Sequence, residues 1–196
     1  MPKPINSVFS AGVTPAQALK RTGDAAFTLF MLDLAPFYHL RQDKAGDMTV
    51  DRWEQEGRKD TAIDLTIDPT SGVAFVSVIS ADAAHARDVA TKLNEFLMLR
   101  PAEEFIALAL RDVADSPALV RAAIACGEEE HAGLREAIEK RLADRSSDVR
   151  GAAVKAAALV SWRSLVPSLQ AAAKGEADPA LRRFIAIALK KCGAEA

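Results

Sequence analysis

Three histidines, His39, His85 and His131, are the residues of this chain best suited to acid–base chemistry. They are far apart in the sequence, and no flanking motif joins one of them to a serine or cysteine nucleophile and an acid. The sequence therefore predicts no catalytic residue. An enzyme whose site lies in the N-terminal half, near Tyr38, His39 and Trp53, stays as an alternative.

Metal and cofactor chemistry has equally little support in the sequence. In "GEEEHAGL", Glu130 and His131 adjoin, but a metal site needs three or four ligands, and acids at a helix N-terminus are stabilised by the helix dipole. Cys126 and Cys192 form no CxxC pair, and no glycine-rich loop connects a strand to a helix. We expect reduced thiols, no metal and no cofactor.

Basic residues gather toward the C-terminus. From Arg145 onward the chain has nine lysines and arginines but four acids, although its overall net charge is −2. Such a surface suits either an acidic protein partner or the phosphates of a nucleic acid. Few aromatic residues are interleaved with the cations, so a protein partner is favoured over nucleic acid. The candidate partner-binding residues are Arg150, Arg163, Arg182 and Arg183.

The elements that position these residues belong to a chain of 196 residues, long enough for one large domain or two small ones. Its composition, 49% hydrophobic but 6% aromatic, favours closely packed helices. "MPKPINSVFSAG" has no apolar segment typical of a signal peptide, and "FTLFMLDLAPF" is too short to span a bilayer. We expect a cytoplasmic protein without a membrane partner.

Residues 1–100 predict a small α+β domain. Thr14 followed by Pro15 marks the start of a helix that we expect to extend to residue 42. Alternating apolar residues then predict a short antiparallel meander, with Asp64 and Thr66 on a solvent-facing side, and a helix follows over 82–99. The strands are expected near 48–53, 61–67 and 73–80. The strand after "DPTSG" could pair with a second chain at a bare sheet edge, giving a homodimer.

Residues 101–196 show no strand signal. Caps of Asp and Ser and stops of Gly delimit six helices joined by short loops, which favours antiparallel neighbours. The expected helices span 102–113, 116–126, 129–143, 147–160, 162–174 and 178–192.

These helices repeat. Val149-Arg150 in "SSDVRGAAVKAAALV" matches Leu181-Arg182 after 32 residues, and Val120-Arg121 precedes it by 29, as if the first copy were one helical turn shorter. A period near 30 made of two helices is typical of an α-solenoid. We expect the alanines to allow close packing, and Arg150 to reach the preceding turn or an acidic neighbour.

The segment from about residue 115 to 193 resembles the short HEAT repeats also found in phycobilisome lyases. The resemblance rests on "DVRGAAVKAAALV" and on "SLVPSLQ", which opens the second helix. It implies a mainly α protein whose C-terminal half is a HEAT-like solenoid of about three helix pairs. Because solenoids usually hold another macromolecule, we expect a protein-binding adaptor, regulator or scaffold, with nucleic-acid binding as the alternative.

Overall fold

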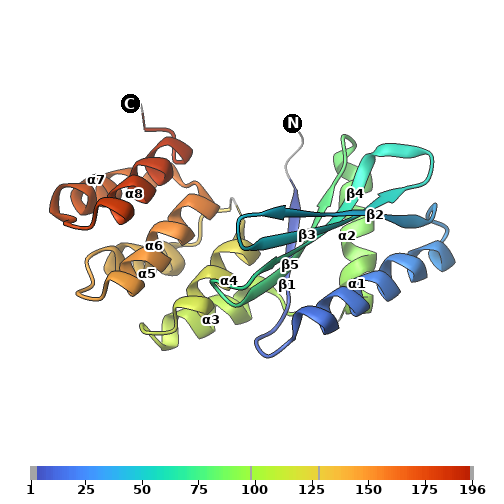
Figure 1. Cartoon of the computed structure of the whole chain (residues 1–196), viewed down its shortest axis with the longest axis horizontal. Helices are drawn as coiled ribbons and strands as arrows, with labels where there is room; N and C mark the ends of the chain where they lie inside the picture. Colours follow the sequence, from blue (N-terminus) through green and yellow to red (C-terminus); the bar gives the residue numbers. More distant parts are fainter. Residues whose placement is uncertain (1–3, 98, 128, 195–196) are drawn as a thin grey trace. The chain divides into compact units, whose positions relative to one another are not determined.

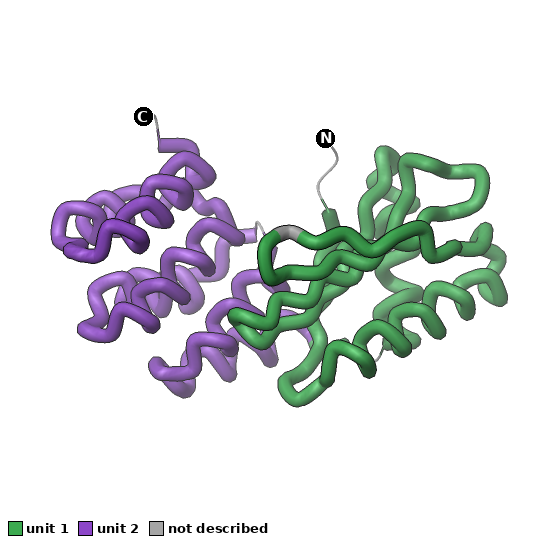
Figure 2. Tube along the Cα trace, viewed as in Figure 1, with its two compact units in different colours: residues 1–100 green, residues 101–196 purple. Residues whose placement is uncertain are grey.

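The computed structural model describes residues 4–97, 99–127 and 129–194. The chain divides into two compact units, Met1–Arg100 and Pro101–Ala196, coloured separately in Figure 2. Its described residues form eight α-helices and one five-stranded antiparallel sheet. The protein is thus mainly α with a small β part.

The first unit contains the whole sheet (Figure 1). The strands lie side by side in the order β1-β5-β4-β3-β2, and every neighbouring pair is antiparallel. The two edges of the sheet are therefore β1 and β2. In chain order the elements are β1 (Ile5–Val8), α1 (Pro15–Thr28), η1 (Leu29–Leu32), β2 (Phe37–Ala45), β3 (Met48–Gln55), β4 (Arg58–Asp68), β5 (Val73–Ile79) and α2 (Ala83–Leu97).

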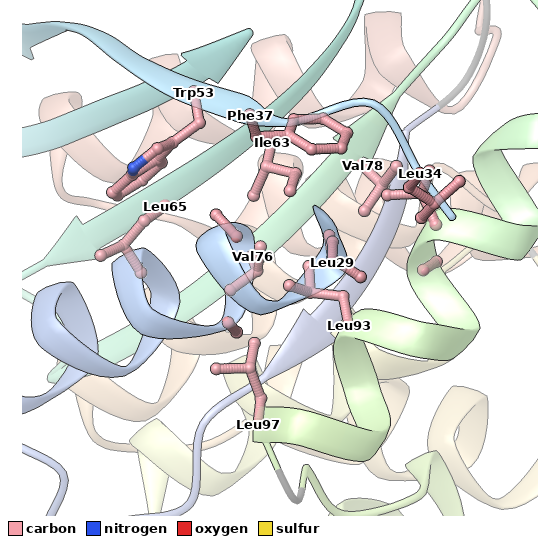
Figure 3. Close-up of a cluster of buried hydrophobic side chains, with 14 of the residues drawn as sticks. Leu29, Leu34, Phe37, Trp53, Ile63, Leu65, Val76, Val78, Leu93 and Leu97 are labelled. Atoms are coloured by element: carbon pink, nitrogen blue, oxygen red, sulfur yellow. The ribbon is translucent and has the colours of Figure 1, made fainter. Parts of the chain in front are cut away.

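Helices α1 and α2 pack on the same face of this sheet, and their apolar side chains form one core with it (Figure 3). Ile63 and Leu65 of β4 are completely buried there, as their alternation predicts. Leu29, which directly follows α1, and Leu93 of α2 belong to the same core. Small residues along α1 let the helix approach the strands closely.

The predicted helix over 14–42 is wrong in its second half. It begins as expected, with Thr14 and Gln17 forming a reciprocal capping box, but α1 ends at Thr28. A short 3₁₀ turn follows, and Asp33 then takes the left-handed conformation at φ 60°. Pro36 has no N–H to continue a helix, so the chain leaves as strand β2.

The meander is also larger than predicted. Residues Ile5–Val8 add strand β1, and β5, the strand after "DPTSG", lies between β1 and β4. The prediction that β5 could pair with a second chain is therefore wrong, because β5 already pairs with β1 on one side and with β4 on the other. Asp64 points away from the core, as predicted, but the solvent exposure expected for it is wrong. Asp64 is buried, with 8% exposed, because Arg52 covers it.

The described residues of the second unit form helices joined by loops, with no strand among them, and the helices lie in two layers. α3 packs on α4, α5 on α6 and α7 on α8, while α4, α6 and α8 follow one another in one layer and α3, α5 and α7 in the other. Alanines 153, 156 and 157 of α6 are fully buried. The bounds are α3 (Ala102–Arg111), α4 (Ser116–Cys126), α5 (Ala132–Leu142), α6 (Ser147–Val160), η2 (Arg163–Leu165), α7 (Val166–Gly175) and α8 (Pro179–Lys191).

Candidate interaction surfaces

Arg150, one of the four candidate arginines, connects two helices of the second unit. Its Nε and Nη2 atoms donate to the two carboxylate oxygens of Glu176 at 2.8 and 3.0 Å. Its Nη1 donates to the carbonyls of Asp144 and Arg145 at 3.0 and 2.9 Å. The guanidinium thus joins the start of α6 to the turn before α8. Both expected partners, the preceding turn and an acidic neighbour, are confirmed.

Arg182 repeats this arrangement on α8. It donates to the carbonyls of Glu176 and Ala177, six and five residues earlier, as Arg150 does to Asp144 and Arg145. The carboxylates of Asp144 and Glu176 each also accept the backbone N–H two residues further along. The sequence repeat of 32 residues is therefore also a repeat of hydrogen bonds.

These bonds set the ionisation of Glu176. The Arg150 guanidinium and the backbone N–H of Asp178 favour its carboxylate and lower its pKa to about 2, and the Glu176 side chain is buried. The hydrogen bonds to Glu176 in turn raise the pKa of Arg150. Arg150 and Arg182 are therefore both hydrogen-bonded within the second unit. Arg150 is partly buried, whereas Arg163, Arg182 and Arg183 are exposed.

Helix α8 has one face that contacts α6 and one that faces solvent. Leu181, Ile185 and Ala188 are buried on the inner face. On the outer face Phe184 is 61% and Ile187 54% exposed. At 100° per residue, these two lie with three exposed cations within an arc of about 120°. We call this set the α8 surface: Arg183, Phe184, Ile187, Lys190 and Lys191.

The first unit brings together two of the three residues named for an enzymatic site. The rings of His39 and Trp53 pack edge to face, with their centroids 5.1 Å apart. His39 Nε2 lies 3.1 Å from Oδ1 of Asp51, which is buried. Gln42 donates to both oxygens of Asp51. Tyr38 points to the opposite face of β2. This group orients an imidazole but offers it no hydroxyl or thiol.

The other two histidines have local roles. The ring of His85 lies 2.6 Å from Oε1 of Gln55. His131 caps α5, since its Nδ1 accepts the N–H of Leu134, while the neighbouring Glu130 pairs with Arg135. Within the described residues, no three His, Cys, Asp or Glu side chains are grouped to hold a metal ion.

Both cysteines are free thiols: Cys126 is partly buried and Cys192 is buried. Burial raises the pKa of each thiol, so the reactive thiolate is disfavoured. Neither thiol therefore has the lowered pKa that is typical of a reactive cysteine.

Arg141 is a structural residue that the sequence does not reveal. Its side chain is buried in the second unit and donates to the carbonyls of Ala109, Asp112 and Val113 at 2.6 to 3.0 Å. It thereby satisfies carbonyls at the C-terminal end of α3. In the sequence it resembles an ordinary basic residue in the last turn of a helix.

A second group of exposed apolar side chains lies in the first unit. Phe27 is 72%, Phe30 53% and Met31 72% exposed, where α1 passes into η1. On the edge strand β2, Tyr38 is 58% and Leu40 50% exposed. Helical spacing alone could not identify these residues as exposed, because it does not show which stripe meets the sheet.

Comparison of the chain with protein-family models, curated proteins and solved structures gives no match. Among the helices described, none has the length and apolar character needed to cross a membrane.

Proposed function

We propose that this protein is a non-enzymatic protein-interaction module, an adaptor, regulator or scaffold, that binds its partner through the α8 surface. The observation that carries the proposal is the exposure of Phe184 and Ile187 one turn apart, bordered by cations. Phenylalanine and isoleucine side chains in this setting suit the centre of an interface, and the cations suit its rim. A cytoplasmic location belongs to the same proposal, since both thiols are unpaired.

The second unit in this proposal is a HEAT-like stack. Support comes from the alternating helix layers and from the bonds of Arg150 and Arg182 that recur after 32 residues. Further support is the length of α4, which has 11 residues where α6 has 14. In such a stack each helix packs on its neighbours. The main contacts of α8 with other helices are to α6 and α7, which leaves its outer face for a partner.

The partner that best fits the α8 surface is an acidic amphipathic helix. Its apolar side chains would cover Phe184 and Ile187, and its carboxylates would meet Arg183, Lys190 and Lys191. Nucleic acid fits less well, because Phe184 is the single aromatic ring of this surface and stacking on bases uses several. Arg163, exposed in η2, belongs to a different element and is not required by this proposal.

Capture from extracts of the native cell tests the proposal. The full chain should retain a protein that the double variant Phe184→Ser, Ile187→Ser loses. The control Phe27→Ser removes an even more exposed aromatic ring in the other unit and should retain that protein. Binding should then be reproduced with the purified partner. Equal capture by the α8 variant and the full chain would contradict the proposal. Nuclease-sensitive binding that weakens steeply with salt would replace it with nucleic-acid binding.

A further inference from the structure

Strand β2 is a bare edge of the sheet. Among the described strands it pairs with β3 alone, so the backbone groups on its other side have no strand partner. The pairing with β3 is irregular between His39 and Arg41 and regular from Arg41 onward. The side chains from Tyr38 to Lys44 are exposed, so a second strand has room to approach.

The charges on this edge are ordered. Arg41 and Asp43 lie on the same face of β2, and Arg41 Nε pairs with Asp43 Oδ2 at 2.7 Å. On the neighbouring strand β3, the residue directly opposite Arg41 is Arg52, another cation. The charge of Arg52 is itself paired with Asp64. Arg41 therefore has a like charge opposite it on β3, and no described strand lies on its other side.

We propose that two copies of this chain associate through their β2 edges as an antiparallel pair, with Gln42 opposite Gln42 of the second copy. In this register each Arg41 faces Asp43 of the other copy, so the two-fold axis creates two cross-strand ion pairs. The sheet then continues through both molecules. The dimer uses the first unit alone and is independent of the partner proposed for α8.

The same charges select this register against its neighbours. A shift that centres the pair on Arg41 places Arg41 against Arg41, and one that centres it on Asp43 places Asp43 against Asp43. Like charges directly opposite each other destabilise a strand pair. Edge charges commonly prevent pairing with other strands, and here the order of Arg41 and Asp43 makes the edge complementary to a second copy of itself. The homodimer through a sheet edge is thus assigned to β2 rather than to β5.

Charge exchange tests this dimer. Sedimentation of the full chain should show a dimer. Arg41→Asp or Asp43→Arg should each raise the dissociation constant of the dimer by about tenfold or more, because each places like charges opposite one another at two positions. The double variant, Arg41→Asp with Asp43→Arg, restores opposite charges and should restore the dimer. Arg87→Asp on α2, an exposed residue with the same change of charge, should leave it unchanged.

Three outcomes would overturn the proposal: a full chain that stays monomeric at every concentration, single variants that dimerise like the full chain, or a double variant that is not rescued. Circular dichroism of each variant establishes that it is folded.

Cross-linking supplies a test that does not depend on charge. Gln42→Cys places the two new thiols opposite each other, within reach of a disulfide, and mild oxidation should give a covalent dimer. In Lys44→Cys the two thiols lie four residues out of register, on the order of 13 Å apart, and should not cross-link. The unsubstituted chain controls for Cys126 and Cys192. Cross-linking of both variants alike, or of neither, would rule out this register.

Discussion

At the scale of single residues, arginines are the principal connectors of the second unit. Arg150 and Arg182 satisfy turn carbonyls, and Arg141 satisfies the end of α3. The sequence allowed the role of Arg150 to be predicted, because its position recurs after 32 residues. It could not identify Glu176 as the acid, since the two residues are 26 positions apart and meet when α8 packs on α6.

Glu176 should make stability depend on pH in acid solution. Its pKa is about 2 in the folded protein and 4.5 for an unperturbed carboxyl, so its contribution is complete above pH 4.5 and is lost as the pH falls toward 2. Glu176→Gln should therefore be less stable than the parent at neutral pH, and the difference should shrink between pH 4.5 and 2. Urea unfolding along a pH series measures this. Glu136→Gln, at an exposed position of α5, is the control, and a constant difference would contradict the assignment.

Arg141→Met should lower the free energy of unfolding by on the order of 2–4 kcal/mol, because it leaves buried carbonyls at the end of α3 without a donor. Chemical denaturation measures the loss. Arg111→Met removes an exposed cation from the last turn of α3 and should have little effect. Equal effects of the two substitutions would show that Arg141 does not act through these carbonyls.

At the scale of elements, the helices of the second unit were predictable because their caps are local signals. The predicted bounds 116–126 and 147–160 coincide with α4 and α6. Strand β2 was not predictable in the same way, since "FYHLRQ" continues an apolar, Ala-rich run and its pairing depends on β3, which follows it. Whether Phe184 and Ile187 face a neighbour or solvent is likewise decided by the packing of α8 on α6.

Close packing of α6 predicts a strong effect of added volume. Ala156 and Ala157 have no exposed surface, so Ala157→Leu should destabilise the protein by about 1–3 kcal/mol through overpacking. Ala186→Leu, at an exposed position of α8, makes the same change of side chain without a packed neighbour and should be nearly neutral. Thermal unfolding of both variants makes the comparison. A neutral Ala157→Leu would contradict the tight approach of the helix layers.

At the scale of the whole molecule, the chain combines two units with separate surfaces. We propose that the second unit presents the α8 surface to a partner and that the first unit presents the β2 edge to a second copy. A dimer would present two α8 surfaces, so binding to a partner with repeated sites would gain from avidity. Losing the dimer should therefore weaken capture of a multivalent partner while leaving the affinity of each site unchanged.

The most direct measurement for the central claim is site-specific photo-cross-linking in the native cell. A photoreactive residue replaces Ile187 on the outer face of α8, and in a control chain it replaces Gln170, an exposed residue of α7. We expect a discrete protein adduct from position 187 and none from position 170. The absence of a protein adduct at 187, or the same adducts at both positions, would contradict the assignment of α8 as the binding surface.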